Sequence, residues 1–157
     1  MNLKDKVVVI TGANGGIGSA IAKALANKGC KLILTGRNLE ELQVLKQGIG
    51  EASSLLEMDV SNSKSVAKAF SKIEENHQSP DVLVNVAGVM PLTYLKNLHL
   101  DEWLETIEVN VKGVLRTVHG VLPSMKKKRE VRLLILPRLM EKNYTREEPF
   151  TVLPKPL

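Results

Sequence analysis

The chain has 157 residues, of which 43% are hydrophobic and 25% are charged, and its formal net charge at pH 7 is +5. These values are typical of one compact globular domain, and no apolar run is long enough to span a bilayer. The start, MNLKDKVVVITG, passes from a short charged segment directly into a strand-like run, so no secretory signal is predicted. The lone Cys30 excludes an intramolecular disulfide framework and favours a cytoplasmic location.

The positive charge belongs to the last part of the chain. Residues 1–125 carry 13 Lys+Arg and 13 Asp+Glu, whereas residues 126–157 carry 9 and 4. All eleven glycines lie at or before Gly120, while four of the seven prolines fall between Pro137 and Pro156. Two compositions therefore meet near residues 126–129, and the basic charge is not interpreted as a nucleic-acid site.

Strand-like and helix-like segments alternate along the chain. The β-branched run at 6–11 predicts a buried parallel strand, and apolar residues at helical spacing predict a helix from Gly16 that stops at Gly29. The order of segments predicts an α/β fold with a doubly wound parallel sheet, right-handed crossovers and helices on both faces. Further strands are predicted at 31–36, 53–60, 80–88 and, as an apolar run, 133–136, and further helices at 39–49, from Ser61 to His77, and from Leu100 to Met125 with kinks near Gly113 and Pro123.

The strongest local signal is the stretch TGANGGIG, from Thr11 to Gly18, between the first predicted strand and the first predicted helix. A glycine-rich turn in this place lets backbone N–H groups approach a pyrophosphate, and the helix N-terminus adds positive potential. The spacing Gly12-x-x-x-Gly16-x-Gly18 differs from the common G-x-G-x-x-G fingerprint, and tight turns also need glycine for steric reasons. The loop alone therefore leaves a phosphate site and a structural turn as open alternatives.

Polar residues follow each of the next three predicted strands. The second strand runs into Arg37, at the place where dinucleotide folds bind the adenosine ribose, and an arginine there suits a 2′-phosphate. Asp59 closes the third strand, and NVAG, from Asn85 to Gly88, closes the fourth, all on the edge where open α/β sheets bind ligands. The alternatives are a solvated loop position for Arg37 and a helix cap for Asp59.

Histidine and tryptophan add no further site. His77, His99 and His119 lack the spacing of metal ligands, so no metal site is predicted. Trp103 is interpreted as a packing residue, and Cys30 as a small buried residue. The run of lysines at 126–128 is interpreted as the solvated C-terminus of a helix, where the helix dipole favours positive charge.

Four motifs in this order and spacing, TGANGGIG, DV at 59–60, NVAG at 85–88 and VNVKG at 109–113, resemble the short-chain dehydrogenase/reductase family. Its members have a Rossmann fold and move a hydride between NAD(P) and an alcohol or carbonyl. The resemblance covers residues 1–125 almost without gaps, and it implies a Rossmann-type sheet that is incomplete at the C-terminus. One departure is Val86, which replaces the second Asn of the family's NNAG.

The resemblance implies roles for residues of this chain. Asn110 matches the helix asparagine that holds a proton-relay water in the family, and Arg37 favours NADP(H) over NAD(H). The implied partners are a small-molecule carbonyl or alcohol substrate and, in intact relatives, further copies of the chain in a homo-oligomer. The implied cofactor-binding residues are Gly12, Asn14, Gly16, Ile17, Gly18, Arg37, Asp59, Val60, Asn85, Ala87 and Gly88.

The family's catalytic set is missing from this chain. In the family a Ser polarises the carbonyl, a Tyr gives or takes the proton, and a Lys four residues beyond lowers the pKa of the tyrosine. Here Tyr94 is followed at that offset by Leu98, and Tyr144 by Glu148. The chain is therefore predicted to be an oxidoreductase by lineage but inactive, with a nucleotide-binding half-domain or a non-functional fragment as the alternatives.

The genetic code offers an account of the tail. Codons back-translated from Val131, in the frame that begins one base earlier, give with suitable synonyms G-Q-I-I-N-[T/S]-S-S-I-D-G-K-K-L-Y-P-G-G-T-V-Y-S-A-T-K-A. This string holds a fifth strand, the serine segment and Y-S-A-T-K, in the order that the family uses after this helix. We therefore expect residues 1–130 to be a partial NAD(P)-binding domain and residues 131–157 to be an out-of-frame tail, with the codons of Lys126–Lys128 as the slip site.

This hypothesis predicts the gene sequence. Resequencing the DNA across the codons of Lys126–Val131 is expected to show one base gained or lost relative to a frame that encodes the tyrosine–lysine signature. An undisturbed frame through these codons, followed by the codons of the present tail, would contradict the hypothesis.

Overall fold

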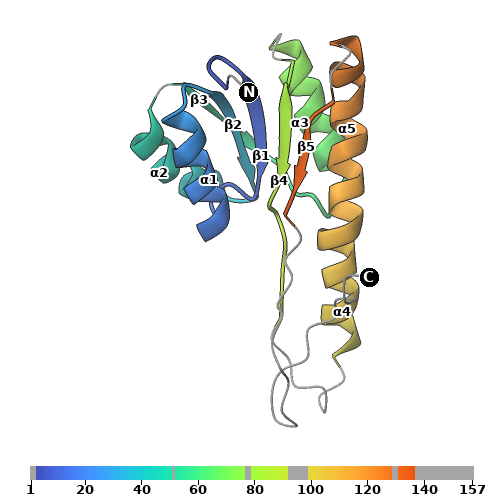
Figure 1. Cartoon of the computed structure of the whole chain (residues 1–157). Helices are drawn as coiled ribbons and strands as arrows, with labels where there is room; N and C mark the ends of the chain where they lie inside the picture. Colours follow the sequence, from blue (N-terminus) through green and yellow to red (C-terminus); the bar gives the residue numbers. More distant parts are fainter. Residues whose placement is uncertain (1–2, 51, 77–78, 92–98, 129–130, 137–157) are drawn as a thin grey trace, which may run out of the picture.

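The strands form one parallel sheet. The computed structural model describes residues 3–50, 52–76, 79–91, 99–128 and 131–136. The strand order is β3-β2-β1-β4-β5 and every pairing is parallel, which confirms the predicted doubly wound sheet (Figure 1). The elements in chain order are β1 (Val7–Thr11), α1 (Gly16–Ala26), β2 (Lys31–Gly36), α2 (Leu39–Ile49), β3 (Ser53–Glu57), α3 (Ser63–Glu75), β4 (Val82–Asn85), α4 (Leu100–Ile107), the π-helical turn η2 (Glu108–Lys112), α5 (Gly113–Lys127) and β5 (Leu133–Ile135).

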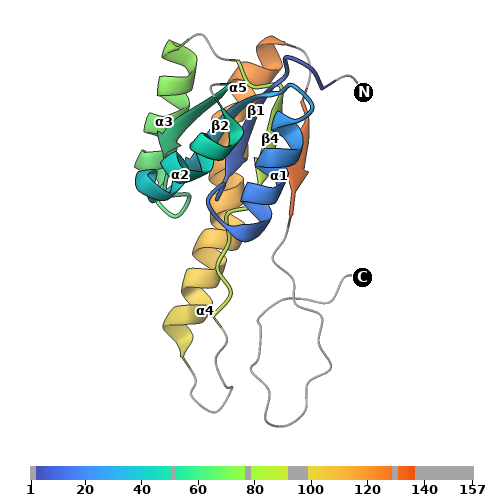
Figure 2. The same cartoon turned by 90° about the vertical axis from the view of Figure 1, so that its left-hand side faces the viewer.

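Helices cover both faces of the sheet. α1 and α2 lie on one face, and α3 and α5 lie on the other (Figures 1 and 2). Consecutive residues of β1 point to opposite faces, so Val9 packs with Phe70 and Met125 in one core cluster, whereas Val8 packs with Leu42 in the other. Because both of its faces are buried, β1 is apolar along most of its length instead of alternating with polar residues.

The turn between β3 and α3 differs from the prediction. The strand predicted at 53–60 ends at Glu57, and the helix begins at Ser63 with Asn62 as its N-cap, not with Ser61. The side-chain oxygen of Asn62 accepts from the backbone N–H groups two and three residues further on, at 3.0 and 3.2 Å. Ser61 is occupied elsewhere, because its backbone N–H and its hydroxyl both donate to Asp59 Oδ1, at 2.9 and 2.7 Å.

The predicted helix from Leu100 to Met125 is divided in its middle. The π-helical turn η2 separates α4 from α5 just before Gly113, so the kink expected there is a local change of helix type. A Cβ on Gly113 would lie 2.9 Å from Cγ2 of Val60, so the glycine lets the helix pass close to the turn after β3. Pro123 lies inside α5 without ending it.

Within the apolar run at 133–136, Leu133–Ile135 form the predicted fifth strand. β5 pairs with β4, and the backbone N–H of Leu136 donates to the carbonyl oxygen of Asn85 at 3.0 Å. The residues of β5 remain 38–46% exposed, unlike those of β1, β2 and β4, which are mostly buried. β5 therefore takes its place through backbone hydrogen bonds and contributes little buried apolar surface.

A partly buried carboxylate ties the opposite, amino-terminal edge of the sheet together. Asp81, just before β4, accepts from the backbone N–H of Val7 at 2.8 Å and from Lys128 Nζ at 2.9 Å, and Lys6 Nζ lies 3.7 Å away. Burial raises the pKa of the Asp81 carboxyl, but the hydrogen bonds from Val7 and Lys128 and the two ammonium groups outweigh it, so the pKa lies below its ordinary value. Lys128, at the end of α5, is therefore held in place instead of being a freely solvated lysine.

Replacing this carboxylate should cost stability in a pH-dependent way. Because the folded-state pKa is depressed, the stabilisation is present above the pKa of the unfolded chain and is lost as the pH falls through the folded-state value. We expect Asp81→Asn to lower the free energy of unfolding by about 1–3 kcal/mol at pH 7, and the difference from wild type to shrink below about pH 4.

The measurement is urea unfolding of both proteins between pH 3 and pH 7. The matched control is Glu75→Gln, which removes a carboxylate from an exposed position at the end of α3. A loss that is the same at every pH would contradict the assigned role of the Asp81 charge.

Candidate functional site at the carboxyl edge of the sheet

A cleft of about 540 Å³ opens at the carboxyl ends of the strands. The connections run in opposite directions from β1 and β4, which lie side by side, so this is the switch point at which open α/β sheets bind ligands. We call it the carboxyl-edge cleft. Its lining residues are Gly12, Asn14, Gly15, Gly16, Ile17, Gly18, Gly36, Arg37, Asn38, Glu41, Met58, Asp59, Val60, Val86, Ala87, Gly88, Val89, Val109 and Leu136.

The glycine-rich loop is shaped by two close contacts. Gly12 has a φ of +62°, and a Cβ there would lie 2.8 Å from Cα of Ala87, so the loop crosses directly over the chain that leaves β4. A Cβ on Gly18 would lie 2.2 Å from the carbonyl oxygen of Gly12, whereas one on Gly16 meets nothing within 4 Å. Gly12 and Gly18 are thus required by packing, and Gly16 leaves the mouth of the loop open.

Helix α1 presents its N-terminus to the cleft. The N-cap residue Gly15 makes no side-chain cap hydrogen bond, and the first turn holds no acidic residue. The first backbone N–H groups of a helix have no partner within the helix, and they carry the positive end of its dipole. Gly15 to Gly18 all line the cleft, so an anion in it would meet these groups.

Thr11 links the glycine-rich loop to the end of β4. Its hydroxyl oxygen accepts from the backbone N–H groups of Val86 and Ala87, each at 3.1 Å. The side chain of Asn85 lies behind the cleft wall, where its Oδ1 accepts from the Thr117 hydroxyl at 2.8 Å and from Thr11 at 3.4 Å. Asn85 is 3% exposed, and its Nδ2 has no hydrogen-bond partner among the described residues.

The β2–α2 turn forms the side of the cleft that is predicted to bind the ribose. Arg37 and Asn38 line it, and the Arg37 guanidinium makes no hydrogen bond or ion pair with the described part of the chain. Asn14 reaches across from the glycine-rich loop, and its Nδ2 donates to Glu41 Oε2 at 2.5 Å. A cation and a carboxylate therefore share this end of the cleft.

Asp59 and Val60 form the wall below β3. Asp59 lines the cleft, and its carboxylate also holds the turn through Ser61, so the site role and the capping role predicted for it coexist. The carbonyl oxygen of Val60 accepts from the Arg116 guanidinium at 3.3 Å, and Arg116 also pairs with Glu108. Hydrogen bonds from Lys112 and Arg116 hold the pKa of the Glu108 carboxyl below its ordinary value.

Asn110 braces the segment that follows β4. Its Nδ2 donates to the carbonyl oxygen of Val89 at 2.8 Å, and its Oδ1 accepts from the backbone N–H of Val89 at 2.9 Å. Asn110 lies in η2, where the π-helical turn displaces it from regular α-helical geometry. Val89 and Val109 line the cleft, so Asn110 lies directly behind its lining.

A family model described as short chain dehydrogenase matches residues 6–135 of this sequence. The chain belongs to the short-chain dehydrogenase/reductase family. Members of this family are oxidoreductases that bind NAD(P) and act on small molecules. The resemblance predicted from the four motifs is therefore confirmed.

Two similar curated proteins are named as uncharacterized oxidoreductases. An uncharacterized oxidoreductase of Staphylococcus saprophyticus is 40% identical over 136 residues, covering 86% of this chain and 55% of the relative. An uncharacterized oxidoreductase of Listeria monocytogenes is 41% identical over 128 residues, covering 79% of this chain and 51% of the relative. The chain thus spans about half the length of the curated relatives that it matches.

Solved structures share the architecture. The serine dehydrogenase of Escherichia coli superposes with a TM-score of 0.75 at 29% identity, over 81% of this chain and 59% of that one. A protein of Brucella melitensis described as ribose-5-phosphate isomerase superposes with a TM-score of 0.77 at 27% identity, over 85% and 50% of the two chains. These likenesses agree with the parallel sheet described above.

The structure gathers most of the predicted cofactor-binding residues around one cleft. Asn85 and Asn110 do not line it, and both lie behind the wall, where they hydrogen-bond to residues of the site. Residues that the motifs did not indicate also line it, among them Asn38, Glu41 and Leu136. The pattern Asn38-x-x-Glu41 at the start of α2 is a capping-box spacing and was the available signal for the first two.

The cleft fits a dinucleotide on observations of this chain alone. The loop from Gly12 to Gly18 has no room for side chains at its two tight contacts, so backbone comes as close to a ligand as it can. The buried Nδ2 of Asn85 is a donor without a partner at the same edge. Among the residues that the structure describes, no group of three or more His, Cys, Asp or Glu could hold a metal ion, and no helix is long and apolar enough to cross a membrane.

Replacement by alanine should have a larger effect at the tightly packed Gly18 than at the open Gly16. Gly18→Ala should lower the free energy of unfolding by about 1–3 kcal/mol, because its methyl group would overlap the carbonyl of Gly12. Gly16→Ala should change it by no more than about 1 kcal/mol, because the position is open and helical. Urea unfolding of the two variants checks this, and equal losses would contradict the assigned packing of the loop.

Proposed function

We propose that this chain binds NADP(H) in the carboxyl-edge cleft and derives from an oxidoreductase that moves a hydride between NADP(H) and a carbonyl or alcohol substrate. The observation that carries the proposal is the glycine-rich loop, which packs at Gly12 and Gly18 and leaves the N-terminus of α1 open to the cleft. The family, which is an NAD(P)-dependent one, supports it.

Different residues of the cleft would contact different parts of the dinucleotide. Backbone N–H groups from Gly16 to Gly18 would hold the pyrophosphate, and Ile17, 59% exposed at the mouth, would pack against the nucleotide. Asp59 and Val60 would border the adenine, and Ala87 and Gly88 the segment beyond the pyrophosphate. The cofactor, when bound, supplies the hydride; the protein's share is to orient it and to exclude water.

Arg37 supports the choice of NADP(H) over NAD(H). Its guanidinium is exposed, lines the cleft and is not neutralised by a described carboxylate. An arginine binds a phosphate through charge-assisted, often bidentate hydrogen bonds. A 2′-phosphate on the adenosine ribose is therefore the ligand that this side chain is suited to.

Asn110 is proposed as the asparagine that serves the family's proton relay. In this chain both atoms of its amide bond to Val89, so the side chain fixes the path of the segment after β4. The relay itself belongs to relatives that carry the tyrosine and lysine, and here Asn110 acts as a positioning residue.

We further propose that the chain binds the nucleotide without turning over. The sequence contains no tyrosine followed at the fourth position by a lysine, and the shifted reading frame from residue 131 would explain why. Residues 1–130 then form the nucleotide-binding part and residues 131–157 the out-of-frame tail. We also propose a cytoplasmic location, and a homo-oligomer in intact relatives. The homo-oligomer is supported by exposed apolar residues along α4, η2 and the start of α5, namely Leu100, Leu104, Ile107, Val111 and Leu115.

Titration of the full chain with NADPH, monitored by fluorescence, tests binding. A turnover assay with small aldehydes and ketones tests hydride transfer. We expect saturable binding without NADPH oxidation, and in Arg37→Gln a loss of NADPH affinity of about tenfold or more with little change for NADH. Absence of binding would favour the non-functional fragment. Measured hydride transfer would contradict the predicted loss of activity.

A further inference from the structure

A carboxylate stands at the same end of the carboxyl-edge cleft as Arg37. Glu41, in the first turn of α2, lines the cleft and carries two hydrogen bonds on its carboxylate. Its Oε1 accepts from Asn38 Nδ2 at 3.0 Å, and its Oε2 accepts from Asn14 Nδ2 at 2.5 Å. The proposed binding of NADP(H) has no use for a negative charge at this place, because a 2′-phosphate is itself an anion.

Helix capping accounts for only one of the two hydrogen bonds. The Asn38 Oδ1 accepts from the backbone N–H of Glu41 at 3.3 Å, and the Asn38 Nδ2 donates back to the Glu41 carboxylate. The spacing is that of a capping box, but the donor to the carboxylate is the side chain of the N-cap residue and not its backbone N–H. The bond from Asn14 is not part of a cap, since it comes from the glycine-rich loop, 27 residues earlier in the chain. It ties the carboxylate to the glycine-rich loop, which lines the same cleft.

The end of β2 is Gly36 and carries no acid. A Cβ on Gly36 would lie 2.6 Å from Oδ1 of Asn14, so a side chain at the end of β2 would displace the asparagine amide that donates to Glu41. Dinucleotide folds that bind an unphosphorylated ribose use a carboxylate near this point to accept from the 2′-hydroxyl. In this chain the carboxylate reaches the cleft from helix α2 instead.

The two opposite charges do not neutralise each other. Among the described ion pairs none joins Arg37 to Glu41, although both line the cleft. Each therefore faces the ligand separately. The guanidinium attracts a phosphate, and the carboxylate accepts from a hydroxyl and repels a phosphate.

We propose that Glu41 is a specificity-determining residue that opposes Arg37 and lets the cleft accept both NAD(H) and NADP(H). The inference rests on the proposed binding of a nicotinamide dinucleotide. Glu41 lowers the preference for the 2′-phosphate by its charge, and Asn14 holds it in that position. Removing this charge should raise the ratio Kd(NAD+)/Kd(NADP+) by about fivefold, the effect of one unit charge at ion-pair distance in water.

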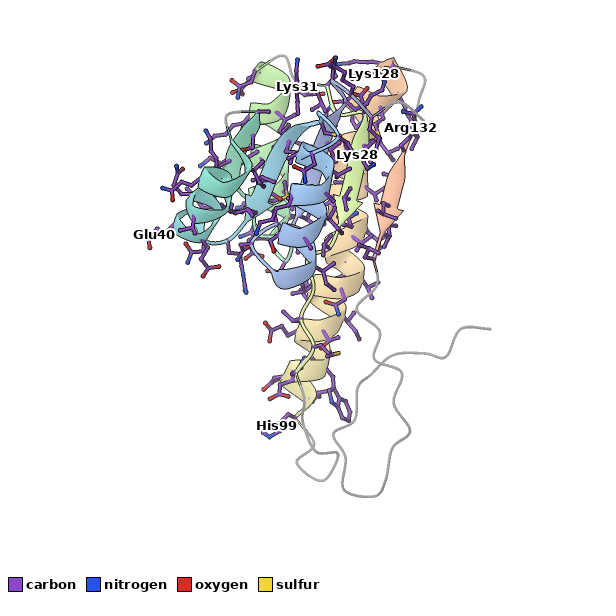
Figure 3. All side chains as sticks on the ribbon, turned by 60° about the vertical axis from the view of Figure 1, so that its left-hand side comes forward. Lys28, Lys31, Glu40, His99, Lys128 and Arg132 are labelled. Atoms are coloured by element: carbon purple, nitrogen blue, oxygen red, sulfur yellow. The ribbon has the colours of Figure 1, made fainter. Side chains whose placement is uncertain are left out.

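The test is calorimetric titration of the full-length wild type, Glu41→Gln and Glu40→Gln with NAD+ and with NADP+. Glu41→Gln removes the charge and retains a side-chain acceptor and the length of the side chain. Glu40→Gln is the matched control, because Glu40 lies in the same helical turn but does not line the cleft and points outward into solvent (Figure 3). Glu41→Ala, with a good helix former at the position, repeats the measurement if the glutamine variant does not fold.

The outcomes separate this inference from the proposed function. A rise in the ratio for the Glu41 variants but not for Glu40→Gln supports the inference. An unchanged ratio in Glu41 variants that bind both nucleotides overturns it and leaves the proposed function standing. Failure of the wild type to bind either nucleotide overturns both.

Discussion

The site depends on one crossing of the backbone, where the turn after β1 passes over the chain that leaves β4. Gly12 makes this crossing possible because any side chain there would overlap Ala87, and the Thr11 hydroxyl fixes it with two hydrogen bonds to the backbone of β4's extension. The crossing is possible only because β1 and β4 are neighbours in the sheet, and this neighbourhood creates the switch point itself. The sequence segments TGANGGIG and NVAG, more than sixty residues apart, are thus two halves of one wall.

The rest of the cleft follows from this wall. Helix α1 starts where the glycine-rich loop ends, so its uncapped N-terminus faces the open side. The β2–α2 turn and the turn after β3 lie next to it because their strands follow β1 in the sheet. Asn85, Thr117 and Asn110 lie one layer behind, and their hydrogen bonds set the position of the residues that a ligand would touch. Hydrogen bonds from these residues behind the cleft hold the lining residues in position before a ligand binds.

The sequence predicted helices and strands well where the periodicity of apolar residues agreed with the residues that end an element. The helix at 39–49 and the strand at 31–36 have the expected bounds, since Asn38 and Gly50 mark the ends of the first and apolar residues fill the second. The turn at 58–62 was misplaced because Asp59, Ser61 and Asn62 are all good cap residues, and only the three-dimensional hydrogen bonds decide among them. Glu41 was missed as a site residue for a similar reason: its sequence context is an ordinary helix start, and its partner Asn14 comes from another part of the chain. The supporting position of Asn85 also needed the fold, because Thr117 approaches it from α5.

β5 differs from the other described strands because all of its residues are exposed, and as an edge strand it pairs with β4 alone. Little burial means that this strand should detach at a lower free-energy cost than the rest of the sheet. Leu136, which follows it directly, is part of the cleft lining. Detachment of β5 is therefore thermodynamically linked to ligand binding in the cleft. A ligand that contacts Leu136 raises the free energy needed to detach β5, by an amount set by the concentration and affinity of the ligand.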